Sequence, residues 1–228
     1  MDEAQDFLQP GEYVDSDADN VVAFARQACG EARDDITKAR RLYYAVRDGI
    51  VYTPYCDFRS PETFRASACL ARGSGFCVAK AALLAAAARA SGIPARVGFA
   101  DVRNHLTTPR LRRLMGTDLF YYHGYTELYL GGKWVKATPA FDRGLCEKFG
   151  VRPLAFDGRE DSLFHPHDVS GRRHMEYVRD RGPAADVPVA DILETFSRCY
   201  PQLTAEAPAP SATQFRREAS RTKPYPSK

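Results

Sequence analysis

The sequence has no long apolar run and no apolar leader at its start. No stretch approaches the roughly 18 apolar residues that suggest a membrane-spanning helix. The opening residues, MDEAQDFLQP, are acidic and lack the apolar core of a signal peptide. We therefore expect a cytoplasmic protein with no membrane partner.

Closely spaced cysteine pairs are also missing. Six cysteines are scattered through the 228 residues, and none forms a C-x-x-C pair. This spacing disfavours a zinc ribbon or a redox dithiol, and without a secretion signal free thiols are expected. The histidines of the HPH sequence, His165 and His167, are more typical of a solvated loop than of a metal site. We expect no metal and no cofactor.

The body of the chain lacks net charge. The formal excess of +3 comes entirely from residues 205–228, which carry five basic and two acidic side chains. Charge alone therefore gives no reason to expect nucleic-acid binding. Because residues 205–228 are rich in Pro, Ala and Ser, we predict a disordered basic tail after a single domain of residues 1–204. Removal of such a tail should leave the melting temperature nearly unchanged.

The first part of the chain has the apolar spacing of helices. Helices are predicted over residues 15–33 and 34–50, and from Ser60, a plausible N-cap, to Gly73. Residues 76–92, FCVAKAALLAAAARASG, are apolar on almost every face, so this helix should be buried on nearly every side.

The second part of the chain has the patterns of strands and turns. Gly131-Gly132 predicts a two-residue hairpin in which paired residue numbers sum to 263, so that Glu127 faces Lys136. The predicted elements are a strand over residues 95–102, a loop or short helix over 104–122, hairpin strands over 123–130 and 133–138, mostly irregular chain over 142–174, and a helix over 186–200 that starts near Pro188.

Cys77 lies in GSGFCVAK, where a small-residue loop enters the buried helix. A cysteine is often a core filler, but unpaired N–H groups and the macrodipole at a helix N-terminus favour a thiolate and can hold an oxyanion. Gly73 and Gly75 would let a substrate approach, and Lys80 could add positive potential. Cys77 is thus a candidate nucleophile that needs a histidine base.

The order of Gly-x-Cys, GIPARVGFADV and HGYTELYLGGKWVKATP resembles the transglutaminase-like superfamily over roughly residues 51–142. The resemblance implies an α+β, papain-like fold, with a helical N-terminal half whose central cysteine helix packs on an antiparallel sheet. It implies acyl transfer on amide bonds of a peptide or protein through a thioester. Cys77 would be the nucleophile and His123 the base, with His105 as a rival in the preceding loop.

The third catalytic residue departs from the family pattern. The family has Asp-Pro after the tryptophan, whereas this chain has Thr138-Pro139. Threonine can accept a hydrogen bond from imidazole but supplies no charge. The hairpin register makes Thr138 and Asp142 diagonal neighbours of His123. We favour Asp142 as the orienting acid, with Thr138, neither residue, or an acid such as Asp101 as alternatives.

The missing Asp-Pro supports a second function, a catalytically weak member that binds peptides. A third and weaker hypothesis is an anionic-partner site in the basic segment, although a solvated loop is more typical. The substrate, the choice between hydrolysis and transfer, and the oligomeric state stay open. The basic segment contains Arg110, Arg112 and Arg113, and the aromatic candidates to line a site are Tyr52, Tyr55 and Trp134.

Overall fold

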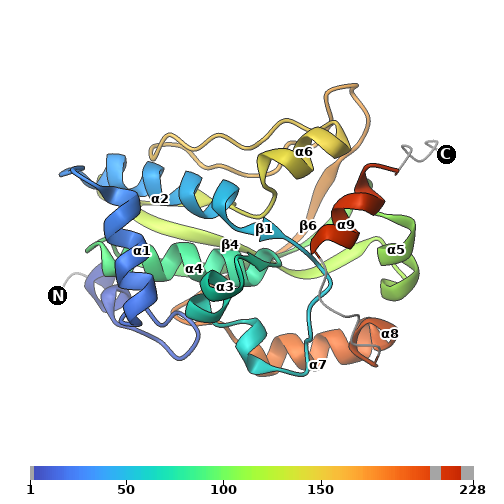
Figure 1. Ribbon diagram of the computed structural model, residues 1–228, viewed down its shortest axis with the longest axis horizontal. Helices are drawn as coiled ribbons and strands as arrows, with labels where there is room; N and C mark the ends of the chain where they lie inside the picture. The colour runs from blue at the N-terminus through green and yellow to red at the C-terminus, as the bar shows by residue number, and fades with distance from the viewer. Residues whose placement is uncertain (1–2, 206–211, 222–228) are drawn as a thin grey trace.

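The computed structural model describes residues 3–205 and 212–221 (Figure 1). Its strands are β1 (Val51–Tyr52), β2 (Ser74–Gly75), β3 (Ala95–Asn104), β4 (Leu119–Leu130), β5 (Lys133–Ala137) and β6 (Met175–Ala184). Its α-helices are α1 (Asp19–Cys29), α2 (Asp35–Gly49), α3 (Ala66–Arg72), α4 (Cys77–Ala90), α5 (Pro109–Met115), α6 (Arg143–Phe149), α7 (Val189–Cys199), α8 (Pro201–Ala205) and α9 (Ala212–Ala219), and the 3-10 helices are η1 (Glu3–Leu8) and η2 (Pro61–Thr63).

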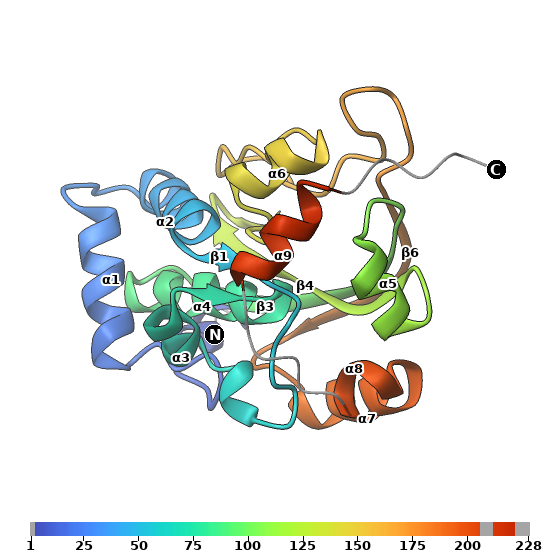
Figure 2. The ribbon, with the colours of Figure 1, turned by 45° about the vertical axis from the view of Figure 1, so that its right-hand side comes forward.

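Helix α4 is the centre of the core, as its apolar composition predicts. Every residue from Val78 to Arg89 is buried. Its many alanines have small side chains, so neighbouring elements can approach its backbone closely. Helices α1, α2 and α3 and strands β3 and β4 all pack against it (Figures 1 and 2). The predicted α+β fold, with the cysteine helix packed on an antiparallel sheet, is confirmed.

The main sheet has the order β5-β4-β3-β6, and all its neighbouring strands are antiparallel. The hairpin of β4 and β5 has the predicted register, because Leu130 pairs with Lys133 and Glu127 pairs with Lys136. Glu127 also accepts a hydrogen bond from Arg96 at 2.7 Å. Among the described residues, no helix is both long and apolar enough to cross a membrane.

Several elements differ from the sequence predictions. The helix predicted from Ser60 is interrupted, since η2 ends at Thr63 and α3 begins only at Ala66. Helix α6 lies in a segment predicted to be irregular, where the Asp142 side chain caps it by accepting from Leu145 N at 3.0 Å. Strand β6 was not predicted, because its residues from Glu176 to Asp180 are exposed and lack apolar alternation. Pairing with β3 orders it.

The basic segment is helix α5. The Thr108 side chain caps it by accepting a hydrogen bond from Leu111 N. Arg110 lies 3.7 Å from Glu218, and Arg112 lies 3.6 Å from Asp118. These arginines have acidic neighbours within the chain, so the structure adds no support for an anionic partner at this segment.

The prediction of a disordered tail is wrong for Ala212–Ala219, which form α9. Phe215 and Ala219 lie one turn apart and bury the same face of this helix. The Phe215 ring, 3% exposed, packs against the rings of Tyr52, Tyr55 and Phe149. Figure 2 shows α9 between α5 and α6. Residues 206–211 and 222–228 lie outside the described residues.

Candidate active site

Cys77 is the first residue of α4 and is partly buried. All six cysteines are free thiols, as predicted. The preceding Gly75 has a packing role, because a Cβ atom there would lie 2.7 Å from Cys69 Sγ and 3.2 Å from Ala79 Cβ. Gly75 therefore lets β2 lie close to α3 and α4. Close packing within the protein accounts for this glycine without a substrate.

Lys80 forms hydrogen bonds with the C-terminal end of helix α2. Its side chain is fully buried, and Nζ donates hydrogen bonds to Arg47 O at 2.9 Å and to Ile50 O at 2.6 Å. Burial lowers the pKa of Lys80 to about 8. These bonds satisfy carbonyl groups at the C-terminal end of α2. The predicted contribution of Lys80 to the potential at Cys77 gains no support.

Strand β4 passes directly against the first turn of α4 at Gly124. A Cβ atom on Gly124 would lie 2.7 Å from Val78 Cα and 3.1 Å from Val78 N, so only glycine allows this approach. The backbone N–H groups of Gly124, Val78 and Cys77 act to lower the pKa of the thiol. The approach also brings His123, which precedes Gly124, into the pocket that Cys77 lines.

Burial keeps both the Cys77 thiol and the His123 imidazole neutral. It raises the pKa of the Cys77 thiol to about 11, although the N–H groups of Gly124 and Val78 oppose this shift. Burial also lowers the pKa of His123 to about 3. At pH 7 the site therefore contains a thiol and a neutral imidazole. A neutral imidazole has the free nitrogen lone pair that a general base needs.

The predicted acid, Asp142, is engaged elsewhere. Its oxygens accept hydrogen bonds from Leu145 N at 3.0 Å, Tyr52 N at 3.2 Å and Arg216 Nη2 at 2.6 Å. Asp142 thus joins α6, the pocket residue Tyr52 and helix α9. No hydrogen bond connects it to His123 within the described part of the chain.

Two buried polar atoms, one on the expected base and one at the expected third position, have no hydrogen-bond partner among residues 3–205 and 212–221. They are Nε2 of His123 and Oγ1 of Thr138. The Phe164 ring packs beside His123 with 5.0 Å between the ring centroids. The His123 imidazole therefore has an aromatic neighbour, and its Nε2 has no hydrogen bond to a carboxylate among the described residues.

A local irregularity in β4 precedes His123. Tyr122 has a left-handed backbone conformation with φ of 52°, and the β3–β4 register shifts between Ala100 and Val102. Asp101 accepts hydrogen bonds from Tyr122 N at 3.2 Å and from Arg181 Nε at 2.6 Å. Asp101 was one of the alternative orienting acids, and here its contact with the site runs through the backbone next to His123.

Tyr52 is the only one of the three aromatic candidates found among the described residues that line the pocket. The Tyr55 hydroxyl bonds to Glu218, and Trp134 packs against Tyr129 and Arg96. The rival base, His105, lies 3.6 Å from Glu176 and does not line the pocket of Cys77. Of these aromatic and histidine candidates, Tyr52 and His123 line the pocket together with Cys77.

Comparison with known proteins gives the family. A family model described as the transglutaminase-like superfamily matches residues 22–139. The chain belongs to the transglutaminase-like superfamily. A search of curated proteins found no match. Among solved structures, the fold is similar to that of a proposed cysteine protease from Cytophaga hutchinsonii, with 18% identity and a TM-score of 0.52. The similarity covers 83% of this chain and 50% of that chain, so the chain spans about half the length of its neighbour.

The transglutaminase-like match ends at Thr138-Pro139, where the resemblance leads one to expect Asp-Pro. It begins within α1, and so includes α2 as well as the cysteine helix and the hairpin. The family thus accounts for the elements that carry Cys77 and His123.

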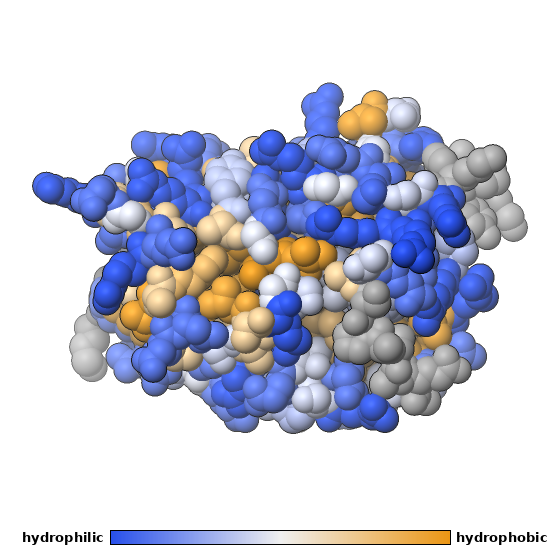
Figure 3. Space-filling model, in the orientation of Figure 1, coloured by the Kyte–Doolittle hydropathy of each residue, from blue (hydrophilic) through white to orange (hydrophobic). Residues whose placement is uncertain are grey.

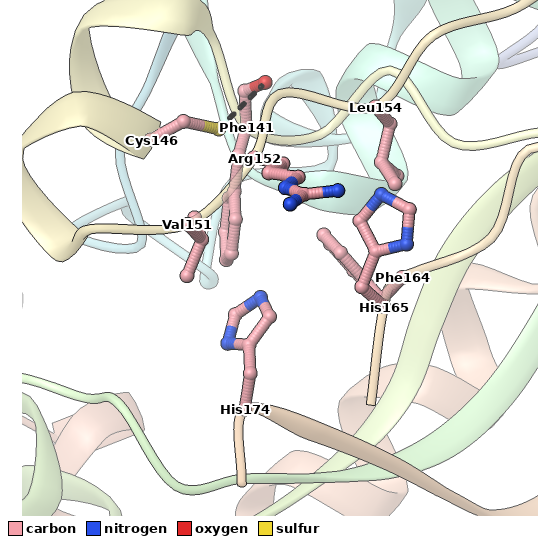
Figure 4. Close-up of a pocket in the computed structure, with 8 residues that line it drawn as sticks. All are labelled: Phe141, Cys146, Val151, Arg152, Leu154, Phe164, His165 and His174. Carbon is pink, nitrogen blue, oxygen red and sulfur yellow. Dashed lines mark hydrogen bonds between the residues drawn. The ribbon is translucent and has the colours of Figure 1, made fainter. Parts of the chain in front are cut away.

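Phe164 lines a second cavity (Figure 4), and its ring packs against both His123 and His174. His174, Arg152 and His165 line it together with apolar side chains, and Nδ1 of His174 has no partner among the described residues. The free space is about 10 Å³, about the room that one water needs. Groups of three or more His, Cys, Asp or Glu that could hold a metal do not occur in the described part of the chain.

Gly124→Ala should impair both folding and activity. The added Cβ would force β4 away from the backbone of α4, with an expected loss of about 1–3 kcal/mol in unfolding free energy. It would also separate His123 from Cys77, so any activity should fall. Urea unfolding and kcat/KM test this. Gly49→Ala is the matched control, since a Cβ there meets nothing within 4 Å. Equal urea midpoints for both variants would contradict the close approach.

The two buried histidines should make the fold sensitive to acid. Burial lowers the pKa of His123 to about 3 and that of His174 to about 4. As the pH falls below the ordinary histidine pKa, both histidines become protonated in the unfolded chain but stay neutral in the folded chain. The free energy of unfolding therefore decreases as the pH falls. The expected loss is on the order of 2 kcal/mol per histidine between pH 7 and pH 5.

Urea unfolding of His174→Phe at both pH values tests this expectation. The variant should lose less stability than the wild-type protein between pH 7 and pH 5. His167→Gln is the control, because His167 is exposed. The same pH dependence in all three proteins would show that burial does not keep His174 neutral.

Proposed function

We propose that this protein is a cysteine acyl-transfer enzyme that acts on amide bonds of a peptide or protein through a thioester on Cys77. The observation that carries the proposal is the approach of Gly124 to the first turn of α4. It brings together a thiol, the backbone N–H groups of Gly124 and Val78 that act to lower the pKa of this thiol, and a neutral histidine. These are the nucleophile, oxyanion donors and base that acyl transfer needs.

In the first half of the reaction, the Cys77 sulfur attacks the amide carbonyl carbon while its proton passes to His123. The N–H groups of Val78 and Gly124 stabilise the oxyanion. The C–N bond then breaks, the leaving amine takes the proton from His123, and the acyl group stays on sulfur. In the second half, His123 takes a proton from water or a second amine, which attacks the thioester and regenerates the thiol.

We propose Cys77 and His123 as a catalytic pair, with Asp142 as a positioning residue. The Asp142 carboxylate holds the backbone N–H of Tyr52, whose side chain lines the pocket. This assignment differs from the sequence prediction that Asp142 orients His123. It rests on the bonds that Asp142 makes to Tyr52, Leu145 and Arg216.

The alternative is a peptide-binding protein with little or no turnover. The unpartnered Nε2 of His123 and the Thr138-Pro139 sequence favour it. Because no carboxylate among the described residues is hydrogen-bonded to Nε2 of the imidazole, the imidazolium that forms during the attack has less stabilisation. This alternative predicts that peptides bind in the pocket without releasing an amine.

Trapping the acyl-enzyme separates the two functions. The protein is mixed with a panel of peptide amides, quenched in acid and measured by intact mass. An enzyme should gain the mass of the donor minus its amine, on the peptide that contains Cys77, and should release that amine. Cys77→Ala should show neither signal. Peptide binding without adduct or amine release would favour the alternative.

Restoring the family carboxylate tests the missing third residue. Thr138→Asp should raise kcat/KM by about tenfold to a hundredfold, because a carboxylate beside His123 stabilises the imidazolium by about 1.4–2.7 kcal/mol. Thr138→Val, which removes only the hydroxyl, is the matched comparison. A loss in Thr138→Val would assign the orienting role to the threonine itself. Unchanged kcat/KM in both variants would show that position 138 does not act on His123.

A further inference from the structure

The pocket of Cys77 and His123 extends into a chamber built by distant parts of the chain. Its walls come from the loop after β1, helix α5, the first part of β4, and helices α7 and α8. The side chains that form these walls include Phe58, Leu111, Met115, Phe196 and Leu203. Apart from this chamber, Figure 3 shows hydrophobic residues gathered from the left side to the centre of its face, between hydrophilic rims.

The chamber offers no charge to a ligand. None of the described residues that line it is an Asp, Glu, Lys or Arg. The Tyr200 hydroxyl is occupied, because it accepts from Tyr121 N at 2.6 Å and donates to Leu119 O at 2.8 Å. A charged or amide side chain placed against the apolar walls of Phe58, Leu111 and Met115 would lose its water without gaining a partner from them. An apolar side chain makes no hydrogen bonds with water and therefore would not lose any on entering the chamber.

The free space sets the size of the occupant. It is about 40 Å³, roughly three times what one water needs. Three water molecules correspond to a volume of about 90 Å³ in the liquid, similar to an aliphatic side chain. The chamber is therefore suited to a side chain of leucine or methionine size that lies next to the reacting carbonyl.

We infer that the chamber is an acyl-donor specificity pocket, and that the substrate carries a large apolar side chain beside the amide that Cys77 attacks. This inference rests on the proposed function and narrows it. A backbone amide that follows an apolar residue fits the chamber, whereas a glutamine side chain would place a polar amide among apolar walls.

Amine release from a matched donor panel tests the inference. The panel has one peptide amide frame with Leu, Met, Ala, Gln, Asp or Lys at the acyl residue. Leucine and methionine donors should exceed the alanine donor in kcat/KM by at least about tenfold. The glutamine, aspartate and lysine donors should fall below alanine.

Two substitutions of the wall residue Met115 are expected to change the donor preference in opposite ways. Met115→Trp fills the chamber, so kcat/KM should drop at least about tenfold for the leucine donor and little for alanine. Met115→Ala enlarges it, so a phenylalanine donor should gain relative to leucine. Leu114→Trp, on the same helix but outside the pocket, is the matched control and should keep the wild-type preference. The rate at which iodoacetamide modifies Cys77 shows whether each variant retains its site.

The outcomes separate this inference from the function on which it rests. No acyl-enzyme from any donor would overturn the proposed function, and the inference with it. An acyl-enzyme formed equally well from leucine, aspartate and lysine donors would overturn the inference alone. So would an unchanged preference in both Met115 variants.

Discussion

Replacing Cys77 by Ala is expected to abolish acyl transfer, with a loss of at least about a thousandfold in kcat/KM. No other thiol is among the described residues that line the pocket with His123, so no neighbouring cysteine can take over the attack. Folding should be unaffected, because Cys77 is only partly buried and alanine is a favourable residue at the start of a helix. Amine release and the urea midpoint measure the two effects.

Cys29→Ala is the matched control for the nucleophile. Cys29 is 7% exposed, and its sulfur lies 3.4 Å from Ser91 Oγ on the far end of α4. Its replacement should lower the urea midpoint and leave kcat/KM unchanged. If turnover survives Cys77→Ala, the proposed mechanism is wrong. If both variants lose activity equally, the loss reflects folding rather than chemistry.

Replacing Phe215 by Ala is expected to release helix α9 and lower the stability of the whole domain. A buried phenylalanine contributes about 3–5 kcal/mol relative to alanine. For a domain of this size a loss of 3 kcal/mol lowers the melting temperature by about 6–12 °C. The Arg216–Asp142 ion pair, with 2.6 Å between Nη2 and Oδ1, should be lost with the helix. Differential scanning calorimetry gives the melting temperature.

Arg217→Ala is the control for helix α9, because Arg217 is exposed on the opposite face. It should leave the melting temperature within a degree or so. Removing residues 206–228 should lower it at least as much as Phe215→Ala does. An unchanged melting temperature in the truncated protein would support the disordered tail that the composition predicts, and would contradict the packing of α9.

Local signals in the sequence were sufficient for the core of the fold. The all-apolar segment after Cys77 specifies a buried helix, and Gly131-Gly132 specifies both the hairpin and its register. Helix α9 and strand β6 carry no such signal. Most residues of α9 are polar, and β6 lacks apolar alternation. Both elements are ordered by partners distant in the sequence, such as Tyr52 for α9 and β3 for β6.

In the candidate site, too, some features follow from local sequence signals and others depend on distant partners. The position of Cys77 at a helix start and of His123 on a strand followed from patterns and resemblance. The hydrogen bond between Asp142 and Arg216 did not follow from such patterns. Arg216 lies 74 residues away, in a segment whose composition suggests disorder. The need for glycine at position 124 was equally hidden, since it depends on how close β4 comes to Val78. Long-range packing decides such features, and a single sequence does not display it.

The two outer strands of the main sheet bear on the solubility of the protein. Open strand edges invite pairing with other chains and can lead to aggregation. Strand β6 exposes Tyr177 and Val178, but its register shifts twice along β3, and its second-last residue is Pro183, which has no N–H to donate. Strand β5 is five residues long and carries Lys133 and Lys136. Both edges thus interrupt the regular ladder that a second molecule would need to extend the sheet.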